Sequence, residues 1–282
     1  MTSLVFFAVL TAALLHAVWN ALVKSGSDKR LNMAAVVIGH LPIAVPMLAF
    51  VPAPDPASYP YLFAGIALHF GYQCFLLESY RIGDLTQIYP IARGVAPLLV
   101  AVVSLVFLGV DLSSMEILAV VTIAAGILSI SLVRGADGLR NGRATAMALT
   151  TGCFIASYSI VDGLGARVAG TALGFYAWLG IANAVLFVVF MAVTTPQVLR
   201  DLPIKGKKIF FVGGSASFVA FSLVMWAFTQ APIALVTALR EISIIFALLI
   251  GVLLMGERLS LGKVVSTMIT LLGVVLLRAT RS

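Results

Sequence analysis

Ten apolar runs, each close to the length of a membrane-crossing helix, divide the chain, and charged residues, proline or glycine mark their ends. The runs cover residues 3–23, 33–52, 60–80, 86–108, 115–133, 144–161, 173–195, 209–229, 233–255 and 261–278. A helix needs about 20 residues to cross a bilayer core of about 30 Å. A barrel strand needs only about ten residues, which alternate between apolar and polar. The pattern therefore predicts an all-α integral membrane protein with ten transmembrane helices.

Composition agrees with this fold class and narrows the possible partners. The chain is 61% hydrophobic and 10% charged, whereas a soluble domain carries about 25% charged residues. The net charge of +7 arises from residues between the runs, where membrane topology explains it, so we expect a lipid bilayer and no nucleic acid as partner. Cys74 and Cys153 fall inside apolar runs and predict no disulfide.

An internal repeat appears when the chain is shifted along itself by 147 residues. Arg93 then meets Arg240, Gly126 meets Gly273, and the turn at residues 109–113 meets the turn at 256–260. A shift of 139 aligns the front of each half more weakly and pairs Trp19 with Tyr158. Each half holds five spans, an odd number, so the second half enters the membrane from the opposite face. We predict two inverted five-helix repeats, residues 1–135 and 143–282.

Basic residues in the predicted loops indicate an orientation. Thirteen Lys or Arg follow odd-numbered spans and three follow even-numbered ones. Basic loops stay cytoplasmic, so the charge bias predicts a multi-pass protein of the inner (plasma) membrane with both termini outside.

The repeat and its turns resemble the ten-helix, EamA-type permeases of the drug/metabolite transporter superfamily. Gly256-Glu257-Arg258-Leu259-Ser260 is similar to the family's Gly-Glu-Arg-Leu-Ser turn, and the first copy, Gly109-Val110-Asp111-Leu112-Ser113, lacks the Glu. His16-Ala17-Val18-Trp19-Asn20 lies where the family often carries a Trp-centred motif. The resemblance implies a carrier fold but no particular substrate. The family is usually drawn with both termini inside, opposite to the charge bias.

Ionisable groups inside spans mark candidate binding residues, because a charge in hydrocarbon must face protein or a wet cavity. Arg93 and Arg240 lie at equivalent repeat positions, and inversion would bring them to one depth at the repeat interface, where such carriers bind substrate. A guanidinium pair could grip a carboxylate, phosphate or phosphonate. Alternatively, Glu241 neutralises one arginine in a purely structural ion pair. Two Arg against one Glu favour an anionic or zwitterionic ligand.

Polar residues of spans one and three are the next candidates for the cavity wall. His16 with Asn20, and His69 with Gln73, share helix faces at a spacing of four. Interhelical hydrogen bonds are the alternative role for the histidines. Aromatic side chains with a polar edge could stack on a ligand or simply pack; these are Trp19, Tyr89 and Tyr158. The histidine spacing resembles no zinc signature, and no nucleotide-binding loop occurs, so we expect neither metal nor cofactor.

The leading hypothesis from the sequence is a secondary transporter or facilitator, not an enzyme. It would move a small organic anion or zwitterion, such as an organic acid, an amino-acid-like metabolite or a phosphonate, by alternating access between the repeats. The alternatives are a non-transporting subunit of a larger membrane complex or, less favoured, an intramembrane enzyme. The protein itself is expected to be a monomer or a homodimer.

Overall fold

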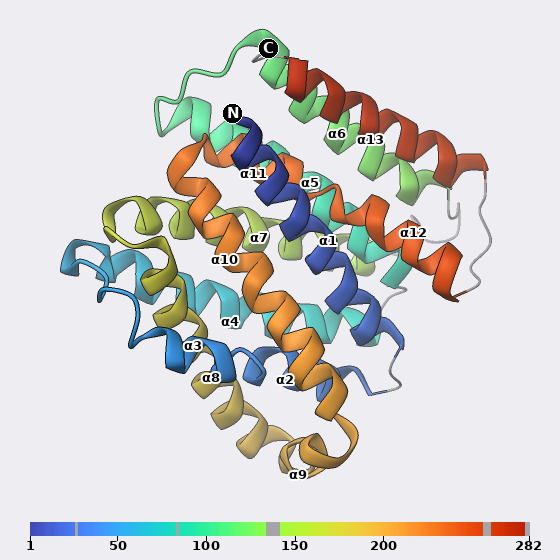
Figure 1. Ribbon diagram of the computed structural model, residues 1–282. Helices are drawn as coiled ribbons and strands as arrows, with labels where there is room; N and C mark the ends of the chain where they lie inside the picture. The colour runs from blue at the N-terminus through green and yellow to red at the C-terminus, as the bar shows by residue number, and fades with distance from the viewer. Residues whose placement is uncertain (26–27, 83–84, 134–141, 256–260, 280–282) are drawn as a thin grey trace.

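The computed structural model describes residues 1–282 except 26–27, 83–84, 134–141, 256–260 and 280–282, and the described part is a bundle of helices without strands (Figure 1). The first half contains α1 (Ser3–Ser25), α2 (Lys29–Ile38), α3 (Leu41–Met47), η1 (Pro56–Ser58), α4 (Tyr59–Ile82), α5 (Leu85–Val106) and α6 (Ser114–Val133). The second contains α7 (Gly142–Val168), α8 (Ala172–Thr194), α9 (Pro196–Lys205), η2 (Ile209–Gly213), α10 (Gly214–Gln230), α11 (Ile233–Arg240), α12 (Ser243–Met255) and α13 (Leu261–Ala279).

The predicted membrane fold class is confirmed by the length and polarity of these helices. Within the described ranges, eight helical segments are long and apolar enough to cross a membrane, and two shorter apolar helices cover Pro90–Val106 and Ser114–Ser129. Large apolar side chains point outward, for example Val189 and Val193 on α8 and Leu272 and Val275 on α13. An apolar exterior of this kind is suited to lipid and would aggregate in water.

Two predicted spans are interrupted within the membrane. Residues 33–52 form α2 and α3, which are separated at Gly39 and His40, and residues 233–255 form α11 and α12, which are separated at Glu241 and Ile242. A Cβ on Gly39 would lie 2.2 Å from the Phe210 carbonyl oxygen, so only glycine allows α2 to approach the start of α10. Broken helices at membrane depth are tolerated where protein or a cavity satisfies the freed backbone groups.

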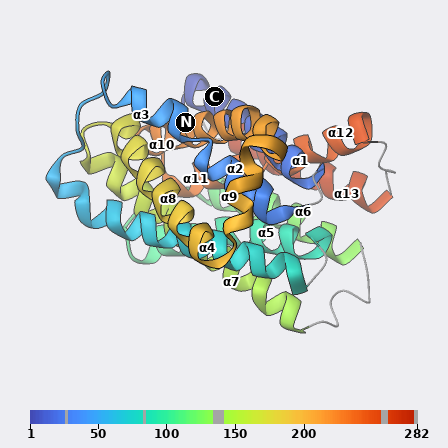
Figure 2. The same cartoon turned by 90° about the horizontal axis from the view of Figure 1, so that it is seen from below.

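Two further differences from the predicted spans concern α7 and α9. Helix α7 continues to Val168, seven residues past the predicted end at 161, so it carries Asp162 and Arg167 within the helix. The Arg167 guanidinium donates hydrogen bonds to the carbonyl oxygens of Phe228 (2.8 Å) and Ala231 (2.9 Å), and so caps the end of α10. The short polar helix α9, which the apolar pattern missed, lies at the lower end of the bundle in Figure 1 and is seen from below in Figure 2.

Helices from the two halves interdigitate. Helix α1 packs against α10 and α12, while α4 and α5 pack against α7. At one side of the bundle, α6 and α13 run side by side in close contact (Figure 1). A Cβ on Gly126 would lie 2.6 Å from the Thr270 nitrogen, and a Cβ on Gly273 would lie 2.7 Å from the Ile123 nitrogen. Glycine is thus required at both crossing points, in agreement with the small-residue contacts typical of membrane helices.

Candidate functional site

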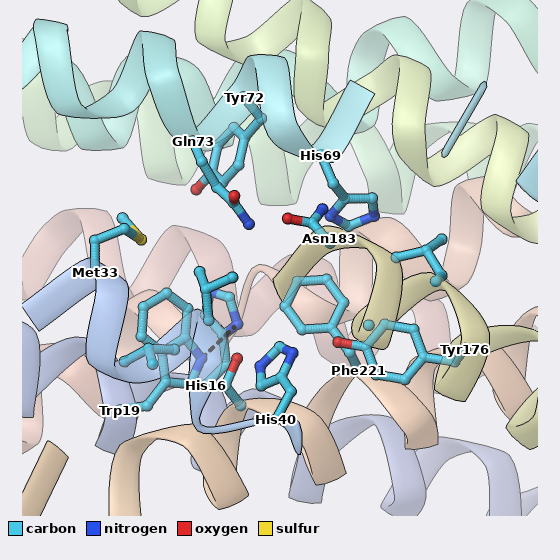
Figure 3. A pocket seen from close by; sticks show the side chains of 15 residues that line it. His16, Trp19, Met33, His40, His69, Tyr72, Gln73, Tyr176, Asn183 and Phe221 are labelled. Atoms are coloured by element: carbon cyan, nitrogen blue, oxygen red, sulfur yellow. Dashed lines mark hydrogen bonds between the residues drawn. The ribbon is translucent and has the colours of Figure 1, made fainter. Parts of the chain in front are cut away.

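A cavity opens between helices of both halves in the interior of the bundle (Figure 3). Its empty volume is about 530 Å³, counting the part open to solvent. Its wall comes from α1, α2, the turn at His40, α4, α8 and α10. The lining residues are His16, Trp19, Met33, Val36, Val37, His40, His69, Tyr72, Gln73, Tyr176, Leu179, Gly180, Asn183, Ser217 and Phe221.

Three polar atoms of the cavity wall are buried without a hydrogen-bond partner in the described part of the protein. They are Oε1 of Gln73, Oδ1 of Asn183 and Nε2 of His40. Figure 3 shows these side chains directed toward the common space from three different segments. Since buried polar groups are almost always paired, three unpaired ones around a single cavity indicate a site that a polar ligand or water fills.

Aromatic and imidazole rings supply half of the remaining lining residues. Tyr176 and Phe221 stack with their planes 15° apart and their centres 5.8 Å apart. The Trp19 indole donates a hydrogen bond to Nδ1 of His16 (3.3 Å; dashed in Figure 3). Stacked rings are rigid, so the cavity presents fixed apolar faces next to its few polar atoms.

Arg93 lies behind His16, outside the cavity lining, at the centre of a buried polar network. It is 1% exposed. Its Nε pairs with Oε2 of Glu241, its Nη1 contacts Nε2 of His16 (2.9 Å), and its Nη2 donates to the Ser243 hydroxyl (2.6 Å). Guanidinium and indole groups only donate hydrogen bonds, and a neutral imidazole has one acceptor nitrogen, so a neutral His16 accepts from Arg93 or from Trp19 but not from both at once.

The break in the second half brings Arg240 to the same network. Arg240 ends α11, where a cation is stabilised by the helix dipole, and its Nη2 lies 3.6 Å from Oε1 of Glu241. The same group donates to the Ser159 hydroxyl (3.4 Å), and the guanidinium lies 5.9 Å from the centre of the Tyr158 ring. Both predicted arginines therefore meet around one carboxylate, Glu241, in the interior.

A second buried carboxylate lies on the other side of Tyr158. Asp162 is 0% exposed, and its Oδ2 is 2.6 Å from Nε2 of His69. The His69 ring stacks on Tyr158, with centres 4.3 Å apart. The network around Glu241 and the pair of Asp162 with His69 together contain two arginines and two carboxylates. The surplus of positive charge that the sequence predicts, from two Arg against one Glu, is therefore cancelled.

The structure places the predicted site residues in three groups. His16, Trp19, His69 and Gln73 line the cavity. Arg93, Arg240, Glu241 and Tyr158 lie directly behind this wall, where the alternative of a structural ion pair between Glu241 and Arg93 is geometrically satisfied. Asn20 lies aside from the lining, and its amide donates to the His16 carbonyl (2.7 Å); the Tyr89 side chain lies outside the described residues.

Residues at or behind the cavity wall that sequence reasoning missed include Asp162, Tyr72, Tyr176, Asn183, Ser217 and Phe221. Asp162 was assigned to a loop because the predicted span ended one residue earlier. Asn183 had a usable signal, since it is a lone amide in an otherwise apolar span. The aromatic residues and the serine had none, because such residues are common in any helix interior. Among the described residues, no three His, Cys, Asp or Glu side chains come together as metal ligands would.

The fold is that of a multi-pass α-helical membrane protein, and it encloses an interior cavity. Residues 143–279 match the model of the EamA-like transporter family, which belongs to the drug/metabolite transporter superfamily. This match confirms, for the second half of the chain, the resemblance found in the sequence to that family of membrane transporters.

The other comparisons add the fold. A solved structure titled "Crystal structure of protein" aligns over 100% of both chains with a TM-score of 0.76 and 18% identity. At this identity the likeness establishes the fold alone. None of the curated proteins matches the chain significantly.

Proposed function

We propose that the protein is a secondary transporter or facilitator that carries a small organic anion or zwitterion by alternating access between two inverted five-helix repeats. The observation that carries the proposal is the cavity itself. Its wall is built by both halves, and three of its buried polar atoms lack a partner within the described residues. A site between two repeats can open to either face when one repeat rocks against the other.

Helix packing supports the inverted repeats and ten spans. The contact of α1 with α10 corresponds to that of α4 with α7, and the glycine contacts of α6 and α13 are reciprocal at the 147-residue shift. Arg278 near the end of α13 donates a hydrogen bond to Ser3 at the start of α1 (2.8 Å). The two helix ends thus lie on one side of the bundle, as an even number of spans requires. We retain the proposed orientation in the inner membrane, with both termini outside.

The ligand would contact the neutral polar and aromatic wall, with the arginines behind it. Gln73, Asn183 and His40 would hydrogen-bond its polar groups, and Tyr176 with Phe221 would cover its apolar part. Because the guanidinium groups are outside the lining and are offset by carboxylates, Arg93 would act on the ligand indirectly, by holding His16 in place, and Arg240 would help to hold Glu241. Organic acids, amino-acid-like metabolites and phosphonates all fit these terms.

Counterflow in proteoliposomes tests the proposal. Purified protein is reconstituted with unlabelled gluconate, alanine or methylphosphonate inside, and uptake of the same labelled solute is measured. We expect exchange of at least one solute above that of protein-free vesicles. Gln73→Leu and Asn183→Leu should each raise the half-saturating concentration about 2- to 12-fold, the value of one hydrogen bond.

Gln230→Leu is the matched control, since Gln230 is exposed at the end of α10; it should exchange solute as the wild type does. Absence of exchange for all three solutes, or wild-type affinity in both cavity variants, would refute the proposal. Copurification of a stoichiometric partner together with absent exchange would instead favour the non-transporting subunit.

A further inference from the structure

The hydrogen-bonded pair of His69 and Asp162 has no role in the proposed binding of solute. Asp162 is fully buried on α7 and does not line the cavity, while His69 on α4 does. The carboxylate can only accept a hydrogen bond, so at 2.6 Å the Nε2 atom of His69 carries the proton between them. The second ring nitrogen, Nδ1, then holds a lone pair on a ring that lines the cavity.

Close packing against Gly65 and two aromatic rings encloses this pair. Asp162 approaches Gly65 so closely that a Cβ there would lie 2.6 Å from its Oδ1, and this oxygen has no hydrogen-bond partner among the described residues. Tyr158 on α7 covers one face of the His69 ring, and Phe221 on α10 meets it edge to face. The ring is therefore reached from the cavity.

Titratable and charged groups face the pair from several elements. The neutral groups are three tyrosines and two histidines: Tyr72 on α4, Tyr158 on α7, Tyr176 on α8, His40 before α3 and His16 on α1. The charged groups lie behind Tyr158 and are Arg93 on α5, Arg240 on α11 and Glu241 after it. Helices α2 and α10 and the turn η1 contribute no titratable group to this wall. Of the three histidines, His16 contacts an arginine rather than a carboxylate, and His40 has no described carboxylate partner. Only His69 combines a carboxylate with access to the cavity.

We infer that His69 and Asp162 form a proton-binding site, and that the protein carries one proton together with its solute. This inference rests on the proposed transport function and specifies its coupling. With a neutral His69 the buried charges of the two clusters cancel, so an anion entering the cavity meets no net countercharge. One proton on Nδ1 supplies that countercharge, and the pair of proton and monoanion is neutral.

The cycle needs no other reactant. From the side to which the cavity is open, a proton leaves water and binds the Nδ1 lone pair, while Nε2–H keeps its hydrogen bond to Asp162. After the site has opened to the opposite face, the Nδ1–H bond breaks and the proton returns to water as the anion leaves. His69 is thereby restored to its neutral state.

A pH gradient in proteoliposomes tests the coupling. With the vesicle interior one pH unit more alkaline and the membrane potential clamped, wild-type protein should accumulate labelled gluconate or methylphosphonate up to about tenfold, the limit for one proton per solute. Asp162→Asn keeps the size of the side chain and removes the charge. The ratio of gradient-driven accumulation to counterflow should fall at least fivefold in this variant. Asp201→Asn on the exposed helix α9 is the matched control and should leave the ratio unchanged.

The outcomes separate this inference from the function on which it rests. Normal counterflow without accumulation in the wild type, or undiminished accumulation in Asp162→Asn, would overturn proton coupling and leave a facilitator. If none of the solutes is exchanged, the transport proposal fails, and ¹⁵N NMR of the histidine rings in micelles then decides the proton site. His69, identified by loss of its signal in His69→Gln, should gain a proton on Nδ1 as the pH is lowered while Nε2 keeps its own; a ring that stays neutral at every pH at which the protein remains folded overturns the inference.

Discussion

The substitution Glu241→Gln tests whether one carboxylate holds both arginines in the interior. Glu241 is 0% exposed and pairs with Arg93, while Arg240 lies 3.6 Å away. At this distance and an effective dielectric constant of about 20, one such pair interacts by about 5 kcal/mol before the cost of desolvation. Removing one partner of a buried pair typically costs about 3–5 kcal/mol. We expect the free energy of unfolding to fall by about this amount, because the two guanidinium groups would face each other uncompensated.

Reversible unfolding in mixed micelles of dodecyl maltoside and SDS, followed by circular dichroism, measures this loss. The control is Asp201→Asn, which removes a carboxylate that pairs with Lys205 at the surface (2.9 Å) and should leave the transition unchanged. A cycle with Arg93→Gln should give a coupling free energy of about 0.5–3 kcal/mol with Glu241→Gln. Loss of less than 1 kcal/mol in Glu241→Gln would refute the reasoning and show that water or a relaxed geometry already compensates the charges.

Three further predictions concern packing, pH and topology. Gly126→Ala should lower the free energy of unfolding by about 1–3 kcal/mol, because its Cβ would lie 2.4 Å from the Thr270 hydroxyl oxygen. The control Gly142→Ala should be neutral in the same assay, since a Cβ there meets nothing within 4 Å. Equal stability of the two variants would contradict the close contact. The hydrogen bond from Lys205 lowers the pKa of the Asp201 carboxyl below its usual 3.8. This ion pair in α9 should therefore persist at neutral pH and be lost only as the pH falls through that lowered pKa. The ¹³C chemical shift of the Asp201 carboxyl reports its protonation, and protonation already above pH 5 would contradict the prediction. A cysteine at Lys207 should resist an impermeant thiol reagent applied outside intact cells, and ready labelling would reverse the proposed orientation.

The bundle and much of the cavity could be predicted because hydrocarbon imposes simple rules on sequence. Continuous apolar runs gave the helices, and the 147-residue repeat placed Arg93 and Arg240 at related positions, which the structure brings to one carboxylate. Spacing of four residues on a helix face likewise identified His16, His69 and Gln73, since this spacing directs side chains to one side. These inferences use only local geometry and the high cost of buried charge.

The remainder depends on contacts that hydropathy cannot encode. The breaks at Gly39 and Glu241 fall inside apolar runs, where the reason for the break is a neighbouring helix or a buried ion. Asp162 was excluded because hydropathy falls before α7 ends, although the helix continues with its polar side toward His69. This single residue changed the charge balance of the interior, and with it the physical basis for selecting an anion.

The paired glycines of α6 and α13 have a consequence for how the two halves depend on each other. Gly126 meets residues 266 and 270, and Gly273 meets 119 and 123, which are the same positions displaced by 147. Each helix thus presents to the other the surface that it receives, as subunits do across a two-fold dimer axis. A bulky residue introduced on either helix therefore clashes with the equivalent face of the other. Tighter packing between α6 and α13 requires coordinated substitutions at both equivalent positions.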